Sequence, residues 1–332
     1  MIEAHGLTKR YGHTVAVDDL SFEVRPGHVT GFLGPNGAGK STTMRMIVGL
    51  DAPSRGRVTV DSRLYHDHHR PLFEVGALLE AKAIHGGRSA FNHLLCLAQS
   101  NGIGRRRVDE VLEMVGLTAV ARRRAGGFSL GMGQRLGIAA ALLGDPGTLL
   151  FDEPVNGLDP EGIRWIRQLL QRLAGEGRTV FVSSHLMSEM AITAEHLIVI
   201  GRGRLIADTS VADFVRRSSQ NYVRVRAPEA PRLARLIHEA GAAVDAEDDG
   251  ALAVTGLSIA DIGDLAAAHG LALHELSPQA ASLEEAFMEL TGDSVEYRTG
   301  AGGPAGPAAD GADPGSPDVR TRTAPLPAGK GA

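Results

Sequence analysis

Alternating hydrophobic and polar residues open the chain in two runs, near residues 2–7 and 15–24. This period of two is typical of strands that bury one face, so the pattern predicts a hairpin-type β layer. A short apolar run at residues 28–33 follows the turn Pro26-Gly27 and predicts a buried strand. The chain therefore begins as a β layer that leads into a buried strand.

Helix-like and strand-like patterns then alternate through the middle of the chain. Apolar residues recur at helical spacing in some segments and form short continuous runs in others. In chain order, the expected elements are a helix at 42–50, a strand at 57–60, helical residues 90–121, a helix at 136–143, a buried strand at 149–153, a helix at 163–173 and a strand at 179–182. This alternation predicts an α/β fold with an open sheet.

The composition shifts after residue 212. In chain order, the following patterns are a strand at 222–225, a helix at 233–240, weaker strands near 244 and 252–254, a helix at 259–268, a strand at 271–274 and a last helix that starts with a capping box at 282–285. The order βαββαβα predicts a small α+β accessory domain over residues 213–297. No catalytic constellation occurs in it, and a stabilising appendage is favoured over a regulatory or partner-binding role.

Glycine, alanine and proline dominate residues 298–332, and large apolar residues are almost absent. Such a segment cannot offset the entropy cost of ordering by burying apolar surface. We therefore expect it to be a disordered tail.

The net charge narrows the choice of partners. The 332 residues carry a formal net charge of −5, and the isoelectric point is about 6.2. These values give no overall electrostatic basis for binding nucleic acid or an anionic membrane. No segment approaches the ~18 consecutive apolar residues of a membrane helix, and the N-terminus lacks a signal-peptide pattern. A role at a membrane would therefore depend on another polypeptide.

The chain has a single cysteine, Cys96, in the apolar run 94–98. One cysteine cannot form an intrachain disulfide, which fits a reducing compartment. Because apolar residues surround it, we expect Cys96 to be a buried core thiol rather than a reactive one.

A glycine-rich loop lies between the strand at 28–33 and the helix at 42–50. It reads Gly34-Pro35-Asn36-Gly37-Ala38-Gly39-Lys40-Ser41. Glycines let backbone N–H groups converge on phosphates, and the helix N-terminus adds partial positive charge. Lys40 can reach the terminal phosphates, and the Ser41 hydroxyl can ligate Mg²⁺. A turn that binds nothing is disfavoured because the strand–loop–helix context is the one that a phosphate-binding loop requires.

Polar residues end two of the later strands. Asp152 and Glu153 close a buried strand, where acids are costly unless they are ligated or catalytic. Together with the glycine loop, Asp152 is interpreted as a Mg²⁺ ligand through water and Glu153 as the base beside it. The strand at 179–182 delivers His185, which is a candidate sensor of the γ-phosphate, although a lone histidine is usually structural.

Two further residues each have two interpretations. Tyr11 lies in a turn, where it can stack on a nucleotide base or serve as a strand-end surface tyrosine, and position favours neither. Ser129 precedes the apolar helix at 136–143 in a segment of small residues. That helix start can face an anion, or Ser129 can act as a simple N-cap.

Two charged clusters are interpreted as surface features. The arginine triplets 105–107 and 122–124 have little aromatic interleaving, so solvated helix ends are favoured over contacts with nucleic acid. The segment 65–69 contains three histidines without a plausible metal-ligand spacing, so a solvated loop is favoured there.

The ordered set of motifs resembles the ATP-binding cassette of ABC transporters over about residues 1–210. The set comprises Tyr11, the loop 34–41, a signature-like segment at 129–135, the acid-ended strand 149–153, a Gly-Leu-Asp loop at 157–159 and His185. The resemblance implies a P-loop NTPase cassette over residues 1–212, with a mixed β core and a helical subdomain at about 82–145.

The resemblance also implies that two cassettes close face to face on two ATP molecules. Within one subunit, Tyr11 would stack on adenine, and residues 36–42 (Thr42 included) would wrap the phosphates. Lys40 would contact the β/γ oxygens, while Ser41 and Asp152 would hold Mg²⁺. Glu153 would polarise water, and His185 would contact the γ-phosphate. From the opposite subunit, Ser129 and Gly131 would complete the site, with Asp159 at the dimer seam.

Two positions depart from the usual cassette. Leu130 replaces the first glycine of the signature, while Ser129 and Gly131 keep their places. Glu80 occupies the place of the usual glutamine, where it could bind Mg²⁺ with an added charge. Both departures look like the antibiotic-resistance and lantibiotic-immunity exporter ATPases of bacteria, whose C-terminal extension the accessory domain also resembles.

The leading hypothesis is an ATPase subunit that forms a homodimer on ATP and drives a separate multi-helix membrane permease. The protein would be cytoplasmic, held at the inner face of the membrane by the permease, and would export a drug, antibiotic or peptide. An ABC-type ATPase acting on nucleic acid or ribosomes is the alternative, disfavoured because the chain has one phosphate loop, one signature and no sustained heptads. A pure ATP-binding regulator would bind ATP without turnover. No nucleic acid is expected.

Overall fold

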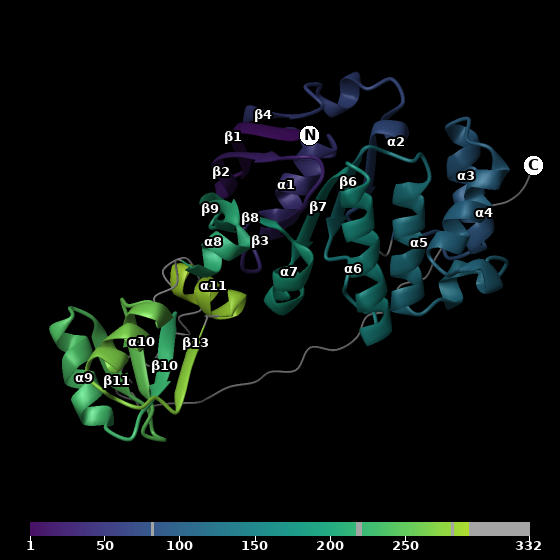
Figure 1. Cartoon of the computed structure of the whole chain (residues 1–332). Helices are drawn as coiled ribbons and strands as arrows, with labels where there is room; N and C mark the ends of the chain where they lie inside the picture. Colours follow the sequence, from purple (N-terminus) through teal and green to yellow (C-terminus); the bar gives the residue numbers. More distant parts are fainter. Residues whose placement is uncertain (81–82, 217–220, 280–281, 292–332) are drawn as a thin grey trace, which may run out of the picture. The chain divides into compact units, whose positions relative to one another are not determined.

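The computed structural model describes residues 1–80, 83–216, 221–279 and 282–291. Figure 1 colours the chain from purple at its N-terminus to yellow at its last described helix. Among these residues, no helix is long and apolar enough to cross a membrane. The tail predicted to be disordered, residues 298–332, lies outside the described residues.

The N-terminal residues form a three-stranded antiparallel sheet with the order β2-β1-β4 (Figure 1). Its strands are β1 (Ile2–Tyr11), β2 (Thr14–Val24) and β4 (Arg55–Val60). Leu20, Phe22 and Val24 are buried, whereas the intervening Ser21 and Glu23 are exposed. The period-two pattern thus predicted both the hairpin of β1 and β2 and the face that it buries.

A six-stranded sheet with the order β5-β6-β7-β3-β8-β9 follows. Its strands are β3 (Val29–Leu33), β5 (Val75–Leu78), β6 (Thr148–Asp152), β7 (Thr179–Ser184), β8 (His196–Gly201) and β9 (Arg204–Ser210). All neighbouring pairs are parallel except β8 with β9. Parallel strands end at the same edge of a sheet, so the residues that follow β3, β6 and β7 come together there.

Two buried apolar clusters cover the two faces of this sheet. Val180 and Val182 of β7 belong to one cluster and Phe181 to the other, because successive strand side chains point to opposite faces. The ring centroid of Phe181 lies 4.9 Å from that of Phe32 in β3 and 5.7 Å from that of Phe22 in β2. This aromatic contact joins the three-stranded sheet to the central sheet.

Helices pack on both sheets. They are α1 (Lys40–Ile47), α2 (Pro71–Glu74), α5 (Leu130–Leu142), α6 (Pro160–Gly175), α7 (Met187–Thr193) and α8 (Val211–Arg216), with a short 3₁₀ segment η1 (Tyr65–Asp67). Helix α5 packs against β5, and α6 packs against β7. The strand–helix alternation predicted from the sequence is therefore present.

Two helices occupy the stretch predicted to be helical at 90–121. They are α3 (Ala90–Ser100) and α4 (Arg105–Met114), followed by the 3₁₀ segments η2 (Thr118–Val120) and η3 (Ala125–Gly127). Helix α3 buries Ala90, Phe91, Leu94 and Ala98, but Cys96 is exposed. The predicted burial of Cys96 is therefore wrong, because 3.6 residues per turn place it outside that buried stripe.

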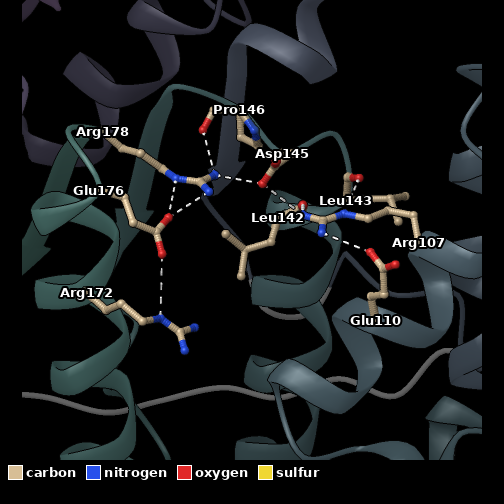
Figure 2. Close-up of polar contacts among 9 residues, drawn as sticks. All are labelled: Arg107, Glu110, Leu142, Leu143, Asp145, Pro146, Arg172, Glu176 and Arg178. Atoms are coloured by element: carbon tan, nitrogen blue, oxygen red, sulfur yellow. Dashed lines mark hydrogen bonds and ion pairs between the residues drawn. The ribbon is translucent and has the colours of Figure 1, made fainter.

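Hydrogen bonds and ion pairs of two arginines connect α4 to the end of α5 and to the segments that precede β6 and β7 (Figure 2). The Arg107 guanidinium donates to the carbonyl oxygens of Leu142 (2.9 Å) and Leu143 (3.3 Å) at the end of α5. Arg107 and Arg178 both pair with the Asp145 carboxylate, at 3.1 and 3.0 Å. Arg107 of the first arginine triplet thus has partners within the protein and is 22% exposed.

The C-terminal residues form a four-stranded antiparallel sheet with the order β11-β12-β10-β13. The elements are β10 (Tyr222–Arg226), α9 (Ala230–Glu239), β11 (Ala243–Ala246), β12 (Leu252–Thr255), α10 (Ile259–Ala268), β13 (Glu275–Gln279) and α11 (Leu283–Thr291). A separate apolar cluster includes Val225, Leu233 and Ile262. The order βαββαβα is the one predicted, and the fold is α+β.

One strand of this sheet is displaced from its predicted place. Residues 271–274 alternate like a strand, but β13 begins at Glu275 and contains Pro278 opposite Val223. Proline cannot donate a ladder hydrogen bond, yet the edge position of β13 tolerates it. Leu271 instead packs into the apolar cluster. The predicted capping box is present, since Glu285 N donates to Ser282 Oγ at 3.1 Å and Ser282 N donates to Glu285 Oε2 at 2.7 Å.

Replacing Arg107 by methionine should lower the free energy of unfolding by about 1–3 kcal/mol, because two carbonyl groups at the end of α5 each lose a charged donor and Asp145 loses one of its two arginine partners. Arg106→Met is the matched control, since Arg106 is 92% exposed and pairs only with Glu110 in the same helix. Its effect should stay within about 0.5 kcal/mol. Denaturant unfolding followed by circular dichroism measures both, and equal effects would contradict the role of Arg107.

Candidate active site

The glycine loop joins the end of β3 to the start of α1. Gly39 has a φ of 105°, in the left-handed region, and a Cβ there would lie 2.5 Å from the carbonyl oxygen of Ala16. A Cβ on Gly34 would lie 2.5 Å from the carbonyl oxygen of Ile200. Side chains are therefore excluded at both positions, which keeps the backbone of the loop bare for a ligand.

Lys40 is buried at the start of α1, with 7% of the residue exposed. Its Nζ donates to the carbonyl oxygens of Gly34 at 2.6 Å and Pro35 at 3.2 Å. Burial lowers the pKa of the Lys40 amine, and the negative charges of Glu153 and Asp152 oppose this effect. The ammonium group is thus held beneath the loop, within the field of both acids.

Hydrogen bonds between the ends of β6 and β7 orient the two acids, Asp152 and Glu153. Asp152 and Ser183 are paired in the parallel register of these strands. The buried Ser183 hydroxyl donates to Asp152 Oδ1 and accepts from the Glu153 N–H at 3.0 Å. Nδ1 of His185 lies 2.7 Å from Glu153 Oε2, and the His185 N–H donates to the same oxygen at 3.3 Å. Hydrogen bonds from β7 and the residue after it therefore orient both carboxyl groups.

These groups share one cavity of about 260 Å³. Its lining consists of Ala16, Asn36, Gly37, Ala38, Gly39, Lys40, Ser41, Thr42, Asp152 and Glu153. His185 joins the set through its contact with Glu153. The structure thus brings together the predicted phosphate loop, the two acids and the histidine, which lie far apart in the sequence.

Tyr11 and Glu80 do not line this cavity. Tyr11 ends β1, is 47% exposed, and its hydroxyl donates to Asp51 Oδ2 at 2.9 Å. Glu80 is exposed just after β5, and its charge is among those that raise the pKa of Arg45. Burial and Asp51 raise the pKa of the Tyr11 hydroxyl, and a hydrogen bond with Thr42 of the cavity lining opposes this effect. Tyr11 therefore adjoins the lining without belonging to it.

Ser129, Gly131 and Asp159 also lie outside the cavity, at the starts of two helices. Ser129 caps α5 by accepting from the Met132 N–H at 3.2 Å. Asp159 caps α6 by accepting from the Gly162 N–H at 2.9 Å. A Cβ on Gly131 would lie 2.9 Å from the Gly157 carbonyl oxygen, which places the two helix starts in contact.

The cavity suits a nucleotide phosphate chain with a divalent cation. Bare loop backbone and the Lys40 ammonium offer hydrogen-bond donors and positive charge to anionic oxygens. The Ser41 hydroxyl and the Asp152 carboxylate, both on the cavity wall, are oxygen donors of the kind that Mg²⁺ prefers. Among the described residues, no group of three or more His, Cys, Asp or Glu side chains is placed to hold a metal, and this includes the histidines at 65–69.

Two contacting residues were not predicted. Ser183 could have been found from the sequence, because the strands ending in Asp152 and Ser184 are neighbours with matched ends. The buried Gln134 of α5 donates through Nε2 to the carbonyl oxygen of Glu153 at 3.1 Å. Nothing in the sequence pattern signals that contact, because α5 and β6 meet there only through the tertiary fold.

Comparison with known proteins identifies the family. A family model described as ABC transporter matches residues 17–156. The uncharacterized ABC transporter ATP-binding protein YhcH of Bacillus subtilis is 35% identical over 299 residues, which cover 89% of this chain and 97% of that protein. The chain belongs to the ABC transporter ATP-binding proteins. It is an ATPase subunit of this family, and the predicted resemblance is confirmed.

A second relative and a solved structure support the same family assignment. The bacitracin transport ATP-binding protein BcrA of Bacillus licheniformis is 37% identical over 242 residues, 72% of this chain and 79% of that protein. A solved dimeric structure of the cassette MJ0796 in a post-hydrolysis state with ADP and Pi aligns with a TM-score of 0.58 and 26% identity, covering 64% of this chain and 99% of that one. Residues 221–284 match a family model described as a domain of unknown function. The predicted fold class is confirmed.

Ser183→Ala should lower the free energy of unfolding by about 1–3 kcal/mol and reduce ATP turnover, because Glu153 N–H loses its acceptor and Asp152 loses a donor. Ser184→Ala is the matched control, since its buried hydroxyl accepts from the Leu186 N–H at 3.0 Å and, within the described part of the chain, bonds neither acid. We expect similar destabilisation but less loss of turnover in the control. Equal turnover in the two variants, measured by phosphate release, would contradict this role of Ser183.

Proposed function

We propose that this ATPase works as a homodimer that powers a separate membrane permease, and that the permease exports an antibiotic, drug or peptide. One observation carries the catalytic part of the proposal. The Glu153 carboxylate lies 2.7 Å from His185 Nδ1 and lines the same cavity as the glycine loop and Lys40. A carboxylate held at the mouth of a phosphate site is placed to act on water beside the terminal phosphate.

Each residue of the cavity has a distinct proposed role. The loop backbone of residues 36–42 binds the phosphate chain, and Lys40 neutralises charge on the β and γ oxygens. Ser41 and Asp152 are the proposed Mg²⁺ ligands, and the ion would supply further neutralisation of phosphate charge. Glu153 orients and polarises the attacking water, while His185 fixes the Glu153 carboxylate and contacts the γ-phosphate. Catalysis then rests on positioning and charge neutralisation.

The second half of the site is proposed to come from another copy of the chain. Ser129, Gly131 and Asp159 lie at helix starts outside the cavity, where the α5 N-terminus can face an anion on a neighbouring subunit. The dimeric MJ0796 cassette, with which this chain aligns, supports the arrangement. In the same dimer, Tyr11 would stack on adenine, and Glu80 would take the place of the usual metal-binding glutamine.

The relatives support a transport role at the membrane. The name of BcrA describes it as a bacitracin transport ATP-binding protein, which favours antibiotic or peptide export here. We place the protein at the cytoplasmic face of the membrane, where the permease would hold it. Residues 213–297 are proposed as a separate accessory domain. A separate apolar cluster within residues 223–271 favours this division, whereas Leu283, Ala286 and Phe287 of α11 belong to a cluster of the cassette. No feature of the described residues favours an action on nucleic acid or ribosomes.

Glu153→Gln should lower ATP turnover by about 10²–10⁴-fold while ATP binding is retained, because the amide keeps the size of the side chain but cannot act as a base. Lys40→Met should instead weaken ATP binding, since it removes the charge beneath the loop. Glu161→Gln, an exposed acid in the first turn of α6, is the control and should behave like the wild type. Phosphate release and binding of a fluorescent ATP analogue measure these effects. Unchanged turnover in Glu153→Gln would overturn the proposed mechanism.

A further inference from the structure

The backbone of Glu153 has an unusual conformation. Its φ is 52°, in the left-handed region that side chains with a Cβ disfavour. The intrinsic backbone preference of a glutamate therefore does not explain the conformation of Glu153. Contacts from the surrounding elements must keep the residue in this conformation.

Contacts to the backbone and to the carboxylate hold Glu153. The backbone N–H donates to Ser183 Oγ at 3.0 Å, and the carboxylate lies 2.7 Å from Nδ1 of His185. The backbone carbonyl oxygen accepts from Nε2 of Gln134 at 3.1 Å. The first two partners come from β7 and the residue after it, whereas Gln134 comes from α5. The Asn156 N–H donates to the same carbonyl oxygen at 3.2 Å, so Gln134 adds a contact from α5 to a local turn at the peptide group between Glu153 and Pro154.

Gln134 lies in the second turn of α5 and is 2% exposed. A buried side-chain amide is costly unless its polar atoms are bonded, so this contact defines where the side chain can lie. The amide supplies a second donor to the Glu153 carbonyl oxygen, beside the Asn156 N–H. Its position is fixed in turn by the start of α5, which Ser129 caps.

The same helix start also contacts the loop after Glu153. A Cβ on Gly157 would lie 2.3 Å from Cδ2 of Leu130, so the Leu130 side chain lies directly on the Gly157 backbone. The carbonyl oxygen of Gly157 likewise lies against Gly131. Helix α5 therefore holds the segment 153–157 at both ends, through Gln134 at one end and Leu130 with Gly131 at the other.

We propose that Gln134 is a positioning residue for ATP hydrolysis: it holds the Glu153 peptide in its left-handed conformation and thereby aims the carboxylate at the cavity. This inference rests on the proposed role of Glu153 as the group that acts on water. Loss of the amide donor leaves the Glu153 carbonyl with the Asn156 N–H of its own turn and removes its restraint from α5. The peptide then rotates more easily toward a right-handed conformation, which moves the carboxylate. Binding of the phosphates by the loop 34–41 does not depend on this contact.

The first test replaces the donor with an apolar side chain of similar length. Gln134→Met should lower kcat by about tenfold or more, because small misplacements of a catalytic group cost large factors in rate. The Kd for a non-hydrolysable ATP analogue should stay within about twofold of the wild type. Gln168→Met, an exposed glutamine in α6, is the control and should leave both quantities unchanged. A wild-type kcat in Gln134→Met, or a loss of kcat only in parallel with ATP affinity and thermal stability, would overturn the inference.

The second test uses pH. Gln134→Glu can donate to the Glu153 carbonyl only when its carboxyl group is protonated, and burial raises the pKa of such a group. Its kcat relative to wild type should therefore rise as the pH falls, whereas the ratio for Gln134→Met should stay constant. If Gln134→Met does not fold, the pH dependence of kcat for Gln134→Glu is the deciding test. A ratio of its kcat to that of the wild type that does not change with pH overturns the inference. Turnover retained by Glu153→Gln would instead refute the proposed function, so the two failures are distinguishable.

Discussion

Two carboxyl groups at the end of a buried strand are the constraint on which this site depends. Asp152 and Glu153 close β6 beside the fully buried end of β7. Acids in such a place are destabilising unless hydrogen bonds and opposite charges surround them. Ser183 and His185 supply the hydrogen bonds, and the buried Lys40 supplies the charge. Each of these partners occupies the end of a strand or the start of a helix.

The parallel sheet explains how these partners meet. Strands β6, β7 and β3 are neighbours, so the residues that follow them gather at one edge, although the glycine loop lies over a hundred residues before the two acids. The glycine loop leaves β3 with bare backbone, and the acids face it across a cavity of about 260 Å³. The bare backbone, the buried ammonium group and the acids together form a cavity that suits the phosphate chain of a nucleotide. The fold thus positions chemistry that the separate segments could not perform.

The sequence revealed those parts of the site whose signal is local. Lys40 and Glu153 could be predicted because a glycine loop and an acid-ended apolar run carry their own pattern. Gln134 could not, since its partner lies in a different element and its helix would look the same without that contact. The expectation for Cys96 failed because an apolar neighbourhood in sequence does not fix the phase of a helix. The strand at 271–274 failed because an edge strand with Pro278 has a weaker pattern than its neighbour.

The central claim is that each chain contributes two different parts to composite ATP sites, so one copy binds ATP but hydrolyses it poorly. The most direct measurement is turnover per subunit over protein concentrations that span the monomer–dimer equilibrium, with sedimentation velocity in the same samples. We expect turnover per subunit to rise with the dimer fraction while the monomer still binds ATP. Constant turnover per subunit down to concentrations at which the protein is entirely monomeric would contradict the claim.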